Sequence, residues 1–151
     1  MHNPVRQAEA VQSQSEYPRV RQVVLDATDI GTLAEFYHQL VGYEYRPGDE
    51  PPADPGADTR QWIVLRAPSG ATGIAFQLVG ELKASTWPEQ LVPQQLHLDL
   101  TVATKAQLDA QHRRALALGA RMLLDRSDDM EEPLRVYADP AGHPFCIFVA
   151  P

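Results

Sequence analysis

Apolar positions in the first third of the chain follow the spacing of a helix with one buried face. Asp29 can cap the first turn by accepting hydrogen bonds from free backbone N–H groups, and Gly42 can end the helix in a left-handed conformation. The buried face between them is formed by Leu33, Phe36, Tyr37, Leu40 and Val41. A second helix is predicted from Thr104, which makes a capping box with Gln107, to Gly119.

Short apolar or alternating runs predict strands on both sides of each helix. In the first half these runs are residues 20–25, 43–46, 62–66 and 74–79, and in the second half they are 95–102, 121–124, 134–138 and 145–149. Residues 47–59 contain four prolines and four acidic residues, which favour a loop. The order strand, helix, strand, strand, strand therefore occurs twice.

This repetition predicts one α+β domain made of two βαβββ repeats. The repeats span residues 19–80 and 94–151, and their last strands share a frame, GIAFQL at 73–78 and GHPFCI at 142–147. Counting back from the helix ends makes Gln22 equivalent to His97, and the shared frame makes Gln77 equivalent to Cys146. Residues 1–18 are expected to be a flexible tail.

Composition restricts the classes of partner. A formal net charge of -7 argues against a nucleic-acid surface, which needs clustered Lys and Arg. The sequence contains one cysteine, so no disulfide framework is expected, and it has no uninterrupted apolar stretch that would cross a membrane. Residues 1–16 lack the apolar core of a signal peptide. A cytoplasmic location is the expectation.

The chain resembles the vicinal oxygen chelate superfamily, which contains glyoxalases, bleomycin resistance proteins and ring-cleaving dioxygenases, and specifically its glyoxalase-like branch. The resemblance extends from residue 19 to the end. It rests on four segments: DIGTLAEFYHQLVGYEY, WPEQLVPQQLHLDLTV, LGARMLLD and DPAGHPFCIFV. It implies a curved mixed sheet that forms a cup, a homodimer, and a metal held by the first and last strands of each repeat.

Carried onto this sequence, the family's metal positions are Gln22, Gln77, His97 and Cys146. Metal-dependent members place carboxylates at one or two of these positions, whereas Gln77 and Cys146 stand where Glu is expected. Glyoxalase isomerisation needs a base beside the metal, and ring cleavage needs two His and one carboxylate, so this set argues against both activities. Cys146 with His97 could still hold zinc or nickel.

Side-chain alternation places Asp99 on the same strand face as His97. His97 and Cys146 could also have purely structural roles. His97 could be a hydrogen-bonded interior histidine, and Cys146 could be a small buried apolar residue. Gln22 and Gln77 could bond each other, water or a ligand. Trp62 and Trp87 are further ligand candidates, because Trp87 lies in the connector just before residues 95–102, where a lid over the cup would form.

Two functions from different classes follow. In the first, the protein binds a small polar or aromatic molecule, without the usual metal, through Gln22, Gln77, His97, Asp99, Trp62 and Trp87. In the second, it is a lyase or isomerase that uses an atypical metal site, or metal-free acid–base chemistry by His97 and Asp99. Metal analysis and substitution of His97 would distinguish these alternatives.

Overall fold

Two repeats with the same order of elements make up the part of the chain that the computed structural model describes, residues 17–150. The first repeat consists of β1 (Gln22–Ala27), α1 (Ile30–Val41), β2 (Glu44–Tyr45), β3 (Trp62–Arg66) and β4 (Gly73–Leu78). Two short 3₁₀ helices, η1 (Pro55–Ala57) and η2 (Pro68–Gly70), lie in its loops. The second repeat consists of β5 (Leu98–Val102), α2 (Lys105–Leu118), β6 (Arg121–Arg126), β7 (Leu134–Ala138) and β8 (Pro144–Val149).

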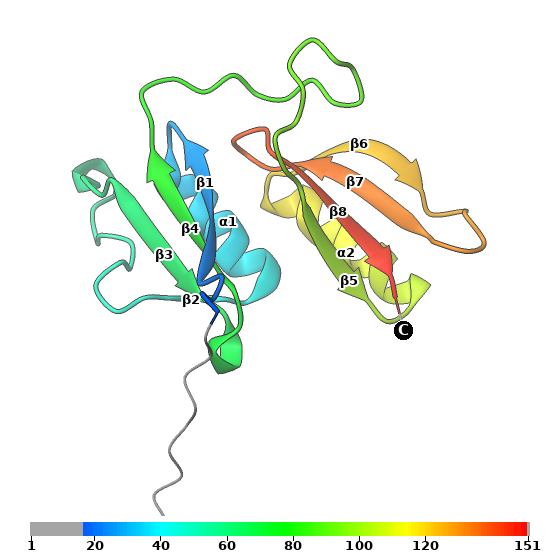
Figure 1. Cartoon of the computed structure of the whole chain (residues 1–151), viewed down its shortest axis with the longest axis horizontal. Helices are drawn as coiled ribbons and strands as arrows, with labels where there is room; N and C mark the ends of the chain where they lie inside the picture. Colours follow the sequence, from blue (N-terminus) through cyan, green and yellow to red (C-terminus); the bar gives the residue numbers. More distant parts are fainter. Residues whose placement is uncertain (1–16, 151) are drawn as a thin grey trace, which may run out of the picture.

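Each repeat forms its own four-stranded mixed sheet (Figure 1). The strand orders are β1-β4-β3-β2 and β5-β8-β7-β6, and in each sheet the first and last strands of the repeat are parallel neighbours. The α+β class and the two βαβββ repeats are therefore confirmed. The two sheets do not close into one cup within the chain. No helix among residues 17–150 is both long and apolar enough to cross a membrane.

The predicted helix ends are confirmed in atomic detail. Asp29 accepts a hydrogen bond from the backbone N–H of Thr32, and Gly42, at φ 72°, donates its N–H to the carbonyl of His38. The capping box of Thr104 and Gln107 is present at the start of α2. These local interactions define where both helices begin and end.

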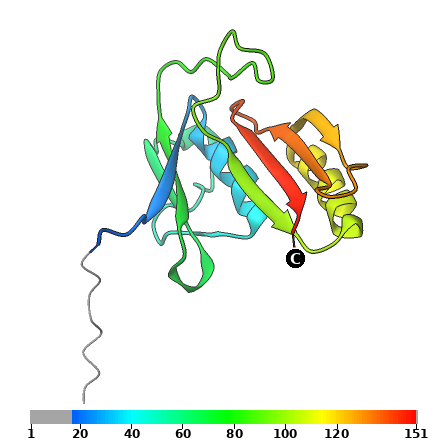
Figure 2. The same ribbon diagram turned by 45° about the vertical axis from the view of Figure 1, so that its right-hand side comes forward.

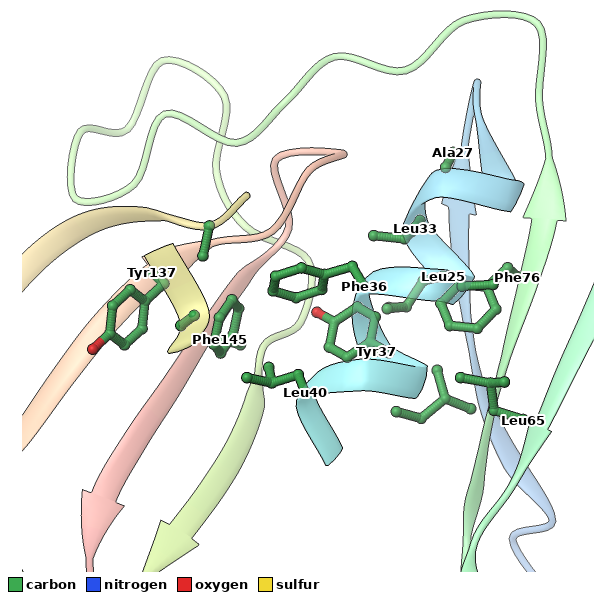
Figure 3. Close-up of a cluster of buried hydrophobic side chains, with 14 of the residues drawn as sticks. Leu25, Ala27, Leu33, Phe36, Tyr37, Leu40, Leu65, Phe76, Tyr137 and Phe145 are labelled. Atoms are coloured by element: carbon green, nitrogen blue, oxygen red, sulfur yellow. The ribbon is translucent and has the colours of Figure 1, made fainter. Parts of the chain in front are cut away.

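Helix α1 lies between the two sheets, as both views of the ribbon show (Figures 1 and 2). Its side chains Phe36 and Tyr37 are buried, and the Phe36 ring lies 5.8 Å from that of Phe145 on β8. The ring of Tyr37 stacks 5.9 Å from Phe76 on β4. Figure 3 shows these rings in one cluster that reaches from the first sheet to the second. The expectation that Phe36 and Tyr37 belong to the core is thus confirmed.

Strand boundaries match the predictions for residues 62–66 and 134–138 and shift elsewhere by one to three residues. β5 begins at Leu98 rather than at residue 95, because its partner β8 begins at Pro144, which has no N–H to donate to the ladder. β6 continues to Arg126, where pairing is supported by an ion pair of 3.2 Å between Asp125 and Arg135 across the strands. The predicted tail, residues 1–18, lies outside the described residues except for its last two positions.

Candidate functional site

A pocket of about 290 Å³ lies on the face of the second sheet that points away from the core. Phe145 and Ile147 of β8 point into the core, so the alternate side chains Cys146 and Phe148 point to the opposite face. Leu124, Leu134 and Val136 join Phe148 in an apolar floor, and polar side chains stand around it. The pocket gathers residues from four strands and two loops of the second half.

Four of the predicted site residues line this pocket: Trp87, His97, Asp99 and Cys146. Asp99 on β5 lies directly beside Cys146 on β8, and His97 precedes β5 on the same face. Nε2 of His97 lies 3.4 Å from Oδ1 of Asp99. Their side chains are 48% and 58% exposed, so His97 is not the interior histidine that the structural alternative assumed. Both side chains are open to a ligand from solvent.

The connector between the repeats brings Trp87 to the same pocket. Thr86 closes a loop with Val92, because its backbone N–H donates to the Val92 carbonyl and its hydroxyl accepts from the Val92 N–H, both at 2.8 Å. Upstream, Ala84 packs against Gly142 so closely that a Cβ on this glycine would lie 2.5 Å from the Ala84 Cβ. Figure 1 shows the connector passing over the turn between β7 and β8. Trp87 is therefore held in place from both sides.

The pocket environment disfavours a thiolate. Cys146 is 9% exposed, and this burial, together with the nearby carboxylates of Asp99 and Glu132, raises its pKa to about 11. The thiol is protonated at neutral pH. The positively charged side chain of the pocket is Arg126. Its Nη2 forms an ion pair of 2.6 Å with Oδ2 of Asp129.

Sequence reasoning missed three polar residues of the pocket, Gln94 and the charged residues Arg126 and Glu132. Arg126 lies on the same strand face as Leu124, so alternation would have found it if the predicted strand had continued beyond residue 124. Glu132 lies in the loop before β7, where no periodic pattern marks a direction. With Asp99, Glu132 gives the pocket two carboxylates that the family's four positions lack.

The predicted residues of the first repeat lie elsewhere. Gln22 pairs with Gly73, whereas Gln77 stands beside Asp26 and Trp62. Four rungs separate Gln22 from Gln77 along the ladder, about 13 Å at the rise of a strand. None of the three predicted residues, Gln22, Gln77 and Trp62, lines the pocket of the second sheet.

The register also gives a different equivalence between the repeats. Cys146 lies opposite Asp99 and Gln77 lies opposite Asp26, so in register terms the counterpart of His97 is Val24, two residues beyond Gln22. The quartet of Gln22, Gln77, His97 and Cys146 does not come together within one chain. Among residues 17–150 no three or more His, Cys, Asp or Glu side chains are placed to hold a metal.

A family model described as a glyoxalase-like domain matches residues 22–148. This chain belongs to that family. It is thereby a member of the vicinal oxygen chelate superfamily, as the sequence resemblance indicated. No curated protein matches the domain in sequence.

Solved structures show the same fold at low identity. A glyoxalase/bleomycin resistance protein/dioxygenase family enzyme from Burkholderia phytofirmans is 18% identical, with a TM-score of 0.65 over 87% of this domain and 98% of that chain. A glyoxalase-related enzyme from Fulvimarina pelagi is 20% identical, with a TM-score of 0.62 over 89% and 90% of the two chains. A fosfomycin resistance protein from Mesorhizobium loti is 12% identical, with a TM-score of 0.61 over 91% and 95%. At these identities the likeness concerns the fold alone.

Proposed function

We propose that this glyoxalase-like domain binds a small polar or aromatic molecule in the pocket of the second sheet. One observation carries the proposal: Trp87, His97 and Asp99, from the connector and from the start of β5, surround an apolar floor in a pocket of about 290 Å³. Pockets of this kind, mostly apolar with a few placed polar groups, are typical of small-molecule sites. The cytoplasmic location predicted from the sequence belongs to the same proposal.

The lining favours a ligand that has a flat apolar part and donor groups. Phe148 and Val136 offer surface to a ring, and Trp87 can cover it from the connector side. Asp99 and Glu132 can accept hydrogen bonds from a hydroxyl or an amine. A protonated thiol is a weak metal ligand, so the proposal does not include a divalent ion.

We further infer a homodimer, as the family resemblance implies. Trp62 is 37% exposed beside exposed Gln77 on the first sheet, and α1 separates this face from the second sheet of the same chain. If the first sheet of a second copy lay over the pocket of the second sheet, it would bring Trp62, Gln22 and Gln77 of that copy to the ligand. Sedimentation equilibrium tests the dimer, and Trp62→Glu should shift it to monomer. At a concentration of about 100 μM even weak dimers form. Wild-type protein that stays monomeric under these conditions would contradict the inference.

The distance of 3.4 Å between His97 and Asp99 supports the second candidate, a metal-free lyase or isomerase. In such an enzyme His97 would move a proton of an enolisable substrate, and Asp99 would orient the ring. Loss of turnover in both His97→Ala and Asp99→Asn, with folding intact, would identify this activity. Turnover that survives both substitutions would exclude it.

Binding is tested with 4-hydroxybenzamide, an aromatic amide with a hydroxyl donor, in ¹H–¹⁵N spectra of the whole chain. We expect saturable shifts of the Asp99 and Cys146 amides and of the Trp87 indole, weakened in Asp99→Asn and unchanged in Asp128→Asn. Asp128 is the matched control because it is exposed and does not line the pocket. Shifts that do not saturate, or equal binding by the two variants, would contradict this site.

Elemental analysis decides the question of the metal. The protein is purified without a chelator and without a metal-binding tag, and then analysed for zinc and nickel. A stoichiometric ion that is lost in His97→Ala would contradict metal-free binding and would support an atypical metal site. Metal below one tenth of the protein concentration, about the level of adventitious binding, would support the metal-free proposal.

A further inference from the structure

A second cavity in the described part of the chain lies away from the pocket of the second sheet. It is a groove of about 940 Å³ along helix α1, and it shares no lining residue with the smaller pocket. Its volume is near the upper end of the range of small-molecule sites. Neither the family resemblance nor the proposed function assigns a role to this surface.

One face of α1 forms the length of the groove. Thr32, Glu35 and Gln39 lie three and four residues apart, so their side chains follow each other along this face. The loop after β2 contributes Pro51 and Pro52 along its border. The accessible apolar surface comes mainly from Leu78 of β4 and Leu118 at the end of α2, while Ile30 and Phe36 lie beneath it at 3% exposure. Leu78 is 41% exposed, which leaves apolar surface open to a ligand.

The loop that borders the groove is held by its own hydrogen bonds and packs against the first turn of α1. Arg60 donates two hydrogen bonds to the carboxylate of Asp58, at 2.8 and 2.6 Å, and a third to the Asp49 carbonyl at 2.7 Å. A Cβ on Gly31 would lie 2.7 Å from the Asp58 carboxylate, so this side chain would have to shift if Gly31 were replaced. The groove is therefore preformed, which lowers the entropic cost of binding.

The charged lining is acidic. The charged side chains that line the groove are three carboxylates and one guanidinium, those of Asp29, Glu35, Asp58 and Arg60. Their formal charges sum to -2. Hydrogen bonds from Gln39 and Tyr45 lower the pKa of Glu35, which is therefore ionised at neutral pH. The positive end of the α1 dipole gives an anion no free site here, because the Asp29 carboxylate already caps it.

We propose that the groove along α1 binds a small amphipathic organic cation, such as an aromatic or alkyl ammonium compound. Its apolar part lies against Leu78 and Leu118, and its ammonium group lies toward Glu35. The charge of the groove and its open apolar surface are both matched by such a molecule, whereas an anion is repelled and a neutral molecule gains only the apolar contact.

The probe is benzyltrimethylammonium, added to the ¹⁵N-labelled full chain, with benzenesulfonate and benzyl alcohol as anionic and neutral comparisons at one ionic strength. We expect saturable shifts at the amides of Gly31, Thr32 and Gln39 with the cation, none with the sulfonate, and weaker ones with the alcohol. Equal shifts with the sulfonate, no saturation, or shifts confined to the pocket of the second sheet would overturn the proposal.

A charge variant gives the second test. Gln39→Lys places an ammonium group four residues after Glu35, a favourable helical pair, and neutralises part of the groove. Binding of the cation should weaken by about threefold or more. Ala106→Lys is the control, because it adds the same charge at an exposed position of α2 outside the groove.

Equal affinity in Gln39→Lys and wild type, or equal weakening in both variants, would overturn the charge-based assignment. The amide spectrum of each variant reports whether it is folded. Should Gln39→Lys not fold, Thr32→Lys at the other end of the same face makes the same change. A loss of binding here with intact binding of 4-hydroxybenzamide would separate this groove from the proposed function of the second sheet.

Discussion

The phenol of Tyr37 donates a hydrogen bond of 2.7 Å to Oδ2 of Asp139, and this bond joins the two repeats inside the core. The other carboxylate oxygen of Asp139 accepts from the backbone N–H groups of Ala141 and His143, at 2.9 and 3.0 Å. Helix α1 of the first repeat is thereby attached to the β7–β8 turn of the second. Nε2 of His143 completes the junction at 2.6 Å from the carbonyl oxygen of Asp26 at the end of β1.

Tyr37→Phe should lower the free energy of unfolding by about 1–3 kcal/mol, because it leaves a buried carboxylate oxygen without its donor. Urea denaturation measures the change. Tyr45→Phe is the matched control: it removes a bond of the same length to Glu35, but at a half-buried position that water can reach. A smaller loss is expected there. Equal losses in the two variants would show that burial of the Tyr37 bond adds nothing.

The same junction predicts a pH dependence. Burial raises the pKa of Asp139, so the folded state holds this proton more tightly than the unfolded state, in which Asp titrates near about 3.9. The stability contributed by this group is present below about pH 4 and is lost as the pH rises through the raised pKa. The free energy of unfolding of wild type, relative to Asp139→Asn, should therefore fall with rising pH.

Urea denaturation of both proteins at a series of pH values between about 4 and 7 measures this difference. Asp128→Asn, at an exposed position, should run parallel to wild type over the same range. A difference between wild type and Asp139→Asn that rises with pH would mean that the hydrogen bonds to Asp139 outweigh its burial.

How much of the fold the sequence predicts depends on whether the signal is local. Gly42 and the capping box of Thr104 set helix ends through contacts within a few residues, and these were predicted. In the register of β1 against β4, buried Leu25 stands beside buried Phe76, which is far away in sequence. Counting residues back from the helix ends cannot detect this packing. It therefore made Gln22 the counterpart of His97, whereas the strand register gives Val24.

The candidate site divides in the same way. Alternation along one strand placed His97 and Asp99 on one face, and both line the pocket with Cys146. Whether the first repeat contributes to the same pocket depends on where α1 lies between the sheets, which no local pattern encodes. Gln77 and Trp62 therefore lie together but outside this pocket.

Gly142→Ala should loosen the connector that carries Trp87. Gly142 has φ 93°, and its added Cβ would meet that of Ala84 at 2.5 Å. Gly48 has a similar φ of 97° with no atom within 4 Å of a Cβ, so Gly48→Ala isolates the cost of the backbone conformation. We expect Gly142→Ala to be the more destabilising by about 1–3 kcal/mol, the usual cost of overpacking.

Tryptophan emission reports the connector itself. In a Trp62→Phe background Trp87 is the only tryptophan, so its emission can be excited selectively, and Gly142→Ala should shift this emission to the red as the side chain leaves the pocket. Gly48→Ala should leave the emission unchanged. Identical spectra and equal stability in the two glycine variants would show that the contact with Ala84 does not hold the connector.

Cys146 should react slowly with iodoacetamide. At its pKa of about 11 the thiol is about 0.1% ionised at pH 8, against about a quarter for an unperturbed thiol, so alkylation should be about two orders of magnitude slower than that of an exposed cysteine of pKa about 8.5 in a short peptide. Burial is the larger cause, and Asp99 and Glu132 add to it. Asp99→Asn should therefore give a modest acceleration that Asp128→Asn does not.

The pH profile of this alkylation decides between the two chemical states of the pocket. A rate that climbs up to about pH 11 means that the pocket keeps a neutral thiol, and zinc could bind only by displacing its proton, with an affinity that rises with pH. An apparent pKa below about 8.5, the ordinary value of a thiol, would contradict the prediction. It would also favour a thiolate ligand beside His97, and so the atypical metal site over metal-free binding.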